Sequence, residues 1–464
     1  MGQTCYLNST LQLLRTIQPL TDAISEYKPE ENGDQYRLMA NMRLLYRHMN
    51  QLTEPIPPVH FLLSLRQLHS QFAETDQAGY FAQQDADEAL TVILGAVAQN
   101  LRGSGSESHQ TIDDLLGVEL THANICAEAT TEIPISVSEK VLKLSCNISI
   151  TTNFLLAGIR DNLTQTIQKY SPTLERVADY ERKSRISRLP PYLCVHMVRF
   201  YWRRDIGKKA KIMRKVKYPL QLDLLELVTD ELRPQLAPIN TAMKRILADR
   251  DDRARIAKRD KSRSLASSEL KAEEDNEETK RAEENKRVTE VIAEQNIDLG
   301  RVGQNPSALY ELCAMVTHKG ASADSGHYIG WARKDQPRAF VPSGEESWYK
   351  FDGPYFYCSS PNTRPLFPCQ SKYLPYCPRP FSFLPYCLSS TGRRTTPSRL
   401  MCITKEQKDP RTLEEKNVKL KHELDDKVSI VDAQKILNLD GGGQDSVAYI
   451  LLYRSVHSFP VSRK

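Results

Sequence analysis

Apolar residues follow a helical period over the first hundred residues of this chain and a strand-like pattern after about residue 117. Leu7, Leu11 and Leu14 recur at i, i+4 and i+7, and they predict a helix over residues 6–18 that Pro19 ends. Three more helices are predicted, over residues 36–50, 59–73 and 85–101. Because the helices come first and the strands follow them instead of alternating with them, the sequence predicts an α+β fold.

Short apolar runs rich in β-branched residues predict the strands of the remaining chain. Strands are expected over residues 132–137, 142–150, 193–201, 218–224, 309–317, 327–333, 347–351, 428–431 and 447–453. The run over 218–224 alternates apolar and polar residues around Pro219, which favours an edge strand.

A first interruption of this pattern covers residues 242–292, and within it the stretch 249–287 is almost all charged and small polar residues. Such a composition is not expected to bury an apolar stripe, so it predicts a solvated helix or a disordered insertion. A spacer is the favoured interpretation, and a docking tail is the alternative.

A second interruption covers residues 353–424 and separates the last two predicted strands from the rest. It holds ten of the 26 prolines and five of the ten cysteines. Its first half is rich in residues with pyrimidine-rich codons, so we hypothesise a retained intron, with a species-specific loop as the alternative.

Composition excludes several classes of protein. The net charge of +5 is too small to indicate a nucleic-acid partner. No run approaches 18 apolar residues and no secretory signal opens the chain, so no membrane partner is expected. No cysteine pair has CxxC spacing, so neither a zinc site nor another cofactor is expected. Free thiols in a reducing compartment are expected, which predicts a cytoplasmic location with the nucleus as a second one.

Cys5 is a candidate nucleophile because it stands one residue before a predicted helix. Backbone N–H groups and the helix dipole favour a thiolate at a helix N-terminus. A lone cysteine in that position is more often inert, so the proposal needs a base and a group to orient it.

His327 and Asp352 are candidates for those two roles. His327 follows the small polar stretch 319–325 and opens a predicted strand, although an exposed loop histidine is the commoner interpretation. Asp352 ends the next predicted strand, 25 residues further on. If the two strands are neighbours, the carboxylate could accept a hydrogen bond from Nδ1 of His327 and fix its tautomer. The order Cys, His, Asp fits a papain-like triad.

Seven motifs, in the right order, resemble those of the ubiquitin-specific proteases. They are GQTCYLNSTLQLL (2–14), QQDADEAL (83–90), LPPYLCVHMVRF (189–200), KVKYPLQLDL (215–224), SGHYIGW (325–331), WYKFD (348–352) and GGGQDSVAYILLY (441–453). The resemblance implies a papain-like fold with a helical thumb and a β-rich palm and fingers. It also implies one catalytic domain over residues 1–456, interrupted by 242–292 and 353–424.

The resemblance implies a deubiquitinating thiol isopeptidase that cuts after the C-terminal glycine of ubiquitin. Cys5 would be the nucleophile, His327 the general base and acid, and Asp352 the group that orients His327. Gln84, Asp85, Gly326 and Tyr328 would lie on the substrate-binding side of the cleft, with a purely structural role as the alternative for Tyr328.

Within the family, the similarity is to the proteasome-associated branch. It is carried by LSC (144–146), SPTLERVADY (171–180) and DDKVSIV (425–431). Ubiquitin, ubiquitinated proteins and the proteasome are therefore the implied partners.

The sequence departs from the family pattern in two ways. The family has an oxyanion-donating Asn five residues before the Cys, whereas only four residues precede Cys5. The N-terminal ubiquitin-like domain of the proteasome-associated branch is likewise expected to be absent. The segment 353–424 also splits the Asp box, since joining Asp352 to Asp425 restores FDDDKV. Asp425 is therefore a fallback for the third triad position, and a catalytically impaired ubiquitin-binding scaffold is the alternative function.

Overall fold

A computed structural model of the chain gives the arrangement of its helices and strands. It describes residues 3–28, 34–51, 56–76, 79–101, 111–129, 132, 136–205, 207–261, 267–320, 326–334, 344–353, 428–441 and 446–456. The chain divides into a large unit, Met1–Asn362 with Lys427–Lys464, and a second unit, Thr363–Asp426, that lies outside the described residues. Apart from Gly353, the predicted insertion 353–424 lies outside the described residues, and so does Asp425.

The first helix, α1 (Cys5–Arg15), buries all eleven of its residues. The helix predicted over 6–18 exists, but the prediction that Pro19 ends it is wrong. A second helix, α2 (Gln18–Glu26), follows after a break at Ile17, and Pro19 lies in its first turn. Proline is tolerated there because the first N–H groups of a helix have no partner within the helix.

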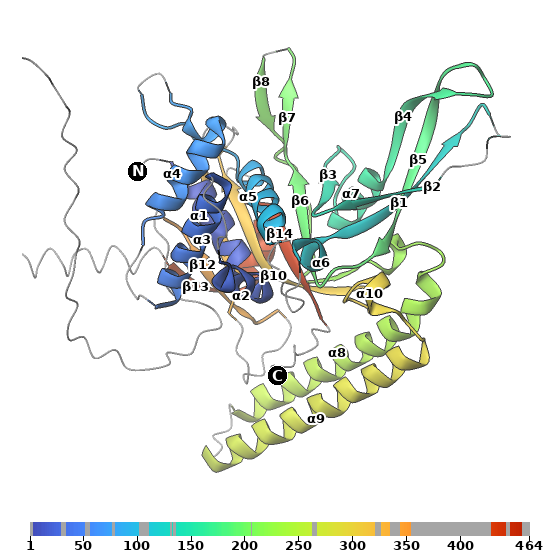
Figure 1. The fold of residues 1–464 in the computed structure, drawn as a ribbon. Helices are drawn as coiled ribbons and strands as arrows, with labels where there is room; N and C mark the ends of the chain where they lie inside the picture. Colours follow the sequence, from blue (N-terminus) through green and yellow to red (C-terminus); the bar gives the residue numbers. More distant parts are fainter. Residues whose placement is uncertain are drawn as a thin grey trace, which may run out of the picture. The chain divides into compact units, whose positions relative to one another are not determined.

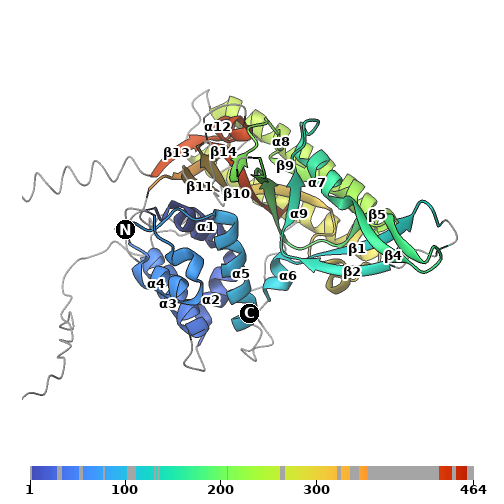
Figure 2. The same ribbon diagram turned by 90° about the horizontal axis from the view of Figure 1, so that it is seen from above.

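The other N-terminal helices confirm the helical character of the first hundred residues (Figure 1). They are α3 (Asp34–Gln51), α4 (Val59–Leu68), the 3₁₀ turn η1 (Ser70–Ala73), α5 (Ala86–Leu101) and α6 (Ile112–Leu116). The helix predicted over 59–73 is split because His69 has an extended backbone. Figure 2 shows α1 on the side of this helical group that faces the central sheet.

A large mixed sheet forms the centre of the described chain, in the strand order β13-β12-β11-β10-β14-β6-β3, with β9 paired to β10. Its strands are β3 (Leu144–Asn147), β6 (Tyr192–Val198), β9 (Gln221–Asp223), β10 (Leu309–Lys319), β11 (His327–Arg333), β12 (Ser347–Phe351), β13 (Val428–Asp432) and β14 (Val447–Ser455). Strand β10 presents side chains to both faces of the sheet, with an irregularity in its register between Leu312 and Ala314. Ala314 and Val316 pack with the N-terminal helices, while Leu312 and Met315 pack into a second core. The central strands are therefore buried on both faces, which is why they are recognisable as apolar runs.

A second sheet has the order β2-β1-β5-β4 and extends away from the helices (Figure 1). Its strands are β1 (Val118–Cys126), β2 (Ser136–Val141), β4 (Thr164–Ser171) and β5 (Arg176–Arg188). The strand predicted over 132–137 falls partly outside the described residues, and the strand found nearby is β2. Strands β4 and β5 and the helix α7 (Leu155–Leu163) were not predicted from the sequence. Most side chains of β4 and β5 are exposed or half-buried, so the sequence there lacks an apolar period.

A solvated helix or a disordered insertion was predicted over 242–292, and the described part of this segment is helical. It lies in two long helices, α8 (Arg233–Lys261) and α9 (Ser267–Glu294), which are side by side in Figure 1. The expectation that this segment buries no apolar stripe is wrong. Ile239, Met243, Ile246, Val288 and Ile292 form a core with Leu309 of β10. Further along the helices, Arg253 pairs with Glu277 and Glu284 at 2.9 and 2.7 Å. Apolar residues at the base of the pair and paired charges beyond it let a charged sequence form an ordered helical pair.

The remaining described elements are short. They are the strands β7 (Phe200–Arg203) and β8 (Lys208–Lys211), the helices α10 (Leu299–Val302) and α12 (Ala433–Leu437), and the 3₁₀ turns η2 (Leu225–Leu227) and η3 (Asn438–Asp440). Helices and sheets are segregated, so the predicted α+β class is confirmed. Among the residues described, no helix combines the length and the apolar character that crossing a lipid bilayer requires.

Candidate active site

Cys5 is the first residue of α1, one residue earlier in the helix than predicted. Its side chain is only 8% exposed, and the backbone N–H of Tyr328 approaches its Sγ at 3.5 Å. The thiol therefore lies at the positive end of a helix and receives a backbone donor from β11. Both features favour negative charge on the sulfur.

Gly330 of β11 lets α1 come close to the strand that carries His327. A Cβ at this position would lie 3.2 Å from the Cα of Ser9, closer than side chains normally approach a backbone. Gly330 has the backbone conformation of an ordinary strand residue. Glycine is therefore favoured here because a side chain would collide with α1. The close packing of α1 on β11 brings residues 5 and 327 together across the sequence.

His327 opens β11, and Asp352 directly follows β12, its antiparallel neighbour. The two side chains meet at 2.5 Å between Nε2 of His327 and Oδ1 of Asp352. The predicted use of Nδ1 for this contact is wrong. Because Nε2 is turned toward Asp352, Nδ1 is the ring nitrogen left to act on Cys5.

The three side chains perturb one another's protonation. The hydrogen bond that His327 donates to Asp352, together with the contact to Cys5, raises the pKa of His327 to about 9. The same bond to His327 holds the pKa of the Asp352 carboxyl well below its usual range, and Lys350 adds to this effect. Charge pairing therefore favours imidazolium beside carboxylate, even though both groups are partly buried.

Asp352 is held from a second side by Lys350, which the sequence analysis did not single out. Nζ of Lys350 lies 2.5 Å from Oδ2 of Asp352, the oxygen that does not face His327. Asn8 of α1 also donates from Nδ2 to the backbone oxygen of Gly353. Asp352 is thus held between His327 and Lys350. The helix α1, which carries Cys5, is bonded to Gly353, the residue that follows Asp352.

Tyr328 was predicted to face the substrate, but its side chain is buried and is not exposed at the site. The ring is 1% exposed and packs 4.6 Å from the ring of His318. The alternative of a structural role agrees with this burial, and only the backbone N–H of Tyr328 reaches the site. Gly326 lies against His318 with a φ of +139°, a conformation that favours glycine.

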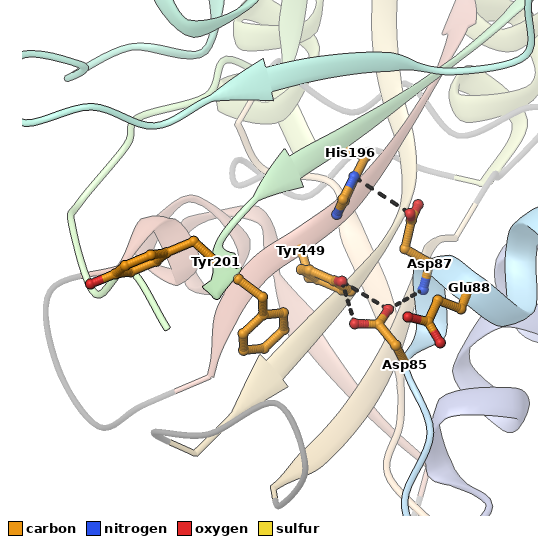
Figure 3. Close-up of a pocket in the computed structure, with 7 residues that line it drawn as sticks. Asp85, Asp87, Glu88, His196, Tyr201 and Tyr449 are labelled. Carbon is orange, nitrogen blue, oxygen red and sulfur yellow. Dashed lines mark hydrogen bonds and ion pairs between the residues drawn. The ribbon is translucent and has the colours of Figure 1, made fainter. Parts of the chain in front are cut away.

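The other two predicted residues, Gln84 and Asp85, precede α5. Gln84 is buried, whereas Asp85 lines a pocket of about 220 Å³ (Figure 3). The described residues around this pocket are Asp85, Asp87, Glu88, His196, Phe200, Tyr201 and Tyr449. The hydroxyl of Tyr449 on β14 donates to both oxygens of Asp85 at 2.8 and 2.7 Å.

The pocket has an acidic wall with a histidine opposite. Asp87 is paired with Lys143 at 2.6 Å, and Nδ1 of His196 lies 3.5 Å from the same carboxylate (Figure 3). Burial lowers the pKa of His196, which favours a neutral ring. The sequence did not single out His196 and Tyr449 as site residues. Both lie in apolar strands, where a ring with a polar atom at its edge cannot be told apart from a core residue. The rings of Tyr449 and Tyr328 are 5.8 Å apart, so the pocket adjoins the Cys5–His327 pair.

The sequence model of the ubiquitin carboxyl-terminal hydrolases matches residues 1–362 of this chain. The chain belongs to that family. It is 34% identical to ubiquitin carboxyl-terminal hydrolase 6 of Schizosaccharomyces pombe over 461 residues, covering 98% of this chain and 77% of that protein. It is 32% identical to ubiquitin carboxyl-terminal hydrolase 6 of Arabidopsis thaliana over 367 residues, covering 76% and 71%.

The family assignment makes this chain a cysteine-type deubiquitinating hydrolase. A solved structure, the SAGA Ubp8/Sgf11/Sus1/Sgf73 DUB module bound to ubiquitin aldehyde, is similar with a TM-score of 0.50 at 15% identity. The match covers 98% of this chain and 68% of that one, and it confirms the predicted fold of the ubiquitin-specific protease type. In the part of the chain described here, no group of three or more His, Cys, Asp or Glu side chains is arranged to hold a metal ion.

Proposed function

We propose that Cys5, His327 and Asp352 carry out the hydrolysis, with Cys5 as nucleophile, His327 as general base and acid, and Asp352 as the orienting group. The observation that carries this is the position of His327, whose Nε2 meets Asp352 at 2.5 Å and whose ring lies close enough to Cys5 to interact with it. The alternative of an impaired scaffold rested partly on the split Asp box. The short contact between Asp352 and His327 supports the active enzyme instead.

In the proposed reaction the sulfur of Cys5 attacks the carbonyl carbon after the C-terminal glycine of ubiquitin. The S–C bond forms, the C–N bond to the lysine amine breaks, and imidazolium His327 gives its proton to that amine. Water then attacks the thioester, with His327 taking a proton from the water, and the C–S bond breaks. A pKa of about 9 keeps His327 protonated at neutral pH, so it holds the proton that the leaving amine needs.

We propose that the pocket around Asp85 receives the last residues of ubiquitin. Its polar wall ends close to Tyr328, whose backbone N–H contacts the Cys5 sulfur. Asp85 itself is held by Tyr449 and accepts the backbone N–H of Asp87 at 2.7 Å. Asp85 therefore supports the wall, while Glu88 and His196 are the side chains better suited to meet substrate.

We propose that the reaction takes place at the proteasome, and therefore in the cytoplasm and nucleus. The support is the sequence similarity of residues 144–146, 171–180 and 425–431 to the proteasome-associated branch. Co-sedimentation of the purified chain with purified proteasomes tests this, and a chain that stays in the supernatant at micromolar concentration would contradict it.

We also propose that residues 1–456 form one catalytic domain with 242–292 and 353–424 as insertions. Phe351 of β12 pairs directly with Val428 of β13, so the second insertion enters at the turn of a hairpin. Excising 353–424 leaves four residues between the strands, an ordinary hairpin loop. Shortening a 76-residue connection to four lowers the loop-closure free energy by about 3 kcal/mol, so a higher melting temperature and a higher turnover are expected. A shortened chain that does not fold would contradict this proposal.

The proposed function is tested with ubiquitin that carries an electrophilic C-terminus. The wild-type chain should form a covalent adduct and Cys5→Ala should not. Cys313→Ala is the matched control and should still form the adduct, because the Cys313 thiol is buried in β10 and donates to the backbone oxygen of Leu452. Ubiquitin binding without an adduct on the wild type would overturn the enzyme proposal for this chain and support the scaffold.

A further inference from the structure

Lys211, the last residue of β8, is a buried lysine outside the Cys5–His327–Asp352 group. Its side chain is 9% exposed, although lysine is seldom buried without a partner. Nζ donates to the backbone oxygens of His318 and Gly320 at 2.9 and 2.8 Å, and it lies 2.9 Å from Nδ1 of His318. The three N–H groups of the ammonium therefore match three acceptors at one end of β10.

The charge state of this cluster is set by its burial. Burial, with a smaller contribution from Arg199, lowers the pKa of Lys211 to about 8. Burial and the neighbouring Lys211 charge lower the pKa of His318 to about 3, so its ring is neutral. A neutral ring can accept through Nδ1, and so the lysine and the histidine form a compatible donor–acceptor pair.

The cluster fixes the backbone on both sides of the residue that pairs with His327. In the β10–β11 ladder, Lys319 is the cross-strand partner of His327, and His318 is the partner of Tyr328. Lys211 binds the carbonyl groups of His318 and Gly320, the two neighbours of Lys319. The end of the ladder, where the catalytic imidazole begins β11, is thereby tied to β8.

The ring of His318 also contacts the residues on either side of His327 at the start of β11. It packs 4.6 Å from the ring of Tyr328, whose N–H contacts the Cys5 sulfur. A Cβ on Gly326 would lie 2.6 Å from Nε2 of His318, so the residue before His327 is in close contact with that ring. A displaced His318 ring would therefore move the backbone on either side of His327.

We propose that Lys211 is a positioning residue for His327, acting through the carbonyl groups of His318 and Gly320 and through the His318 ring. Lys211 touches neither the substrate nor the reacting atoms. The proposal rests on the proposed function, since it assigns Lys211 to the geometry of the proposed base.

The test compares wild type with Lys211→Met, which keeps the length of the side chain and removes its charge and donors. Turnover of a ubiquitin conjugate should fall about 10- to 100-fold in kcat, with KM within about threefold, because a misplacement of about 1 Å can lower a rate 100-fold. The NMR signal of the His327 ring, assigned by its loss in His327→Gln, should shift in Lys211→Met. Lys217→Met, an exposed lysine in the following segment, should change neither readout.

Two outcomes separate a positioning role from a purely structural one. Ile292→Ala removes buried apolar atoms from α9, which packs with Leu309 at the opposite end of β10 from His318, and it should lower stability without moving the His327 signal. A Lys211→Met chain that folds, retains wild-type kcat and leaves the His327 signal unmoved would overturn the proposal. A loss of kcat equal to that of Ile292→Ala at matched stability, with the His327 signal unmoved, would also overturn it.

Failure of the proposed function shows separately, in the wild-type chain. A wild type that forms no adduct with electrophilic ubiquitin would refute the enzyme, whereas the His327 signal still reports whether Lys211 sets the geometry. If Lys211→Met does not fold, Lys211→Gln, which retains two N–H donors, takes its place with the same readouts and a smaller expected loss.

Discussion

The helix α1 and the helical pair α8–α9 are both helical, but the rest of the protein constrains them to very different extents. All eleven residues of α1 are buried, including polar ones such as Asn8 and Gln12. The pair α8–α9 contains 29 and 28 residues; its described side chains are mostly exposed or half-buried, and its apolar core lies near its base. A helix that is packed on every side cannot shift without disrupting its neighbours. Because α1 carries Cys5, this packing fixes the position of the proposed nucleophile.

The polar side chains of α1 and of α8–α9 also differ in what they bind. Thr10 of α1 donates to the backbone of Ala86, and Arg15 donates to the backbone of Met49. On α8–α9, by contrast, the half-buried Arg253 pairs with the buried Glu284 of the other helix. The polar groups of α1 therefore fix it relative to other elements, whereas those of the pair mainly hold two helices together.

The largest expected effect comes from the charge pair beside α1. Asp352→Asn should lower kcat/KM on the order of 10²- to 10⁴-fold, because the base loses its orienting carboxylate. The pKa of His327, about 9 in the wild type, should fall toward its ordinary 6.5. A histidine-resolved NMR titration measures this shift, and an unchanged pKa would show that Asp352 is not the main cause.

The same pair predicts a pH dependence of stability. Folding raises the pKa of His327, so its stabilising effect is full below pH 6.5 and is lost as the pH rises through about 9. The free energy of unfolding should therefore differ more between wild type and Asp352→Asn at pH 6 than at pH 10. Urea unfolding at the two pH values is the measurement, and equal differences would contradict the linkage.

A matched pair of core truncations tests the comparison directly. Leu11→Ala on α1 should destabilise the chain by about 2–5 kcal/mol and also lower kcat, because α1 carries Cys5. Ile292→Ala on α9 should cost at the lower end of that range and leave kcat within about twofold. Both variants are assayed at a temperature where circular dichroism shows them folded. A loss of kcat in the α9 variant alone would reverse the comparison.

The smallest expected effect is in the ion pairs of α8–α9. Glu284→Gln removes the shared partner of Arg250 and Arg253, and it should lower stability by about 1 kcal/mol, less at high salt. Turnover should not change. Glu283→Gln, at the neighbouring exposed position, is the control and should have no measurable effect on the melting temperature.

Local patterns in the sequence were enough to find most helices of the first hundred residues and the buried strands of the central sheet, although α2 was missed because Pro19 was taken as a helix end. Strands β4 and β5 escaped because their side chains are mostly exposed, so no apolar period marks them. The pair α8–α9 was misjudged because its apolar residues stand at either end of a charged segment and meet only when the two helices pack. Periodicity reports the surroundings of a residue within one element, and it carries little information about packing between elements.

The sequence by itself determined the three candidate catalytic residues. They are a cysteine at the start of a helix, a histidine at the start of a strand and an aspartate at the end of the next strand. Only the tertiary structure decided that Nε2 rather than Nδ1 meets Asp352, and that Lys350 holds the other oxygen. It also brought Lys211 to the end of β10 and Tyr449 to Asp85, across 107 and 364 residues. These contacts depend on the register of paired strands and on the packing of α1 against β11, which arise only when distant segments of the chain meet.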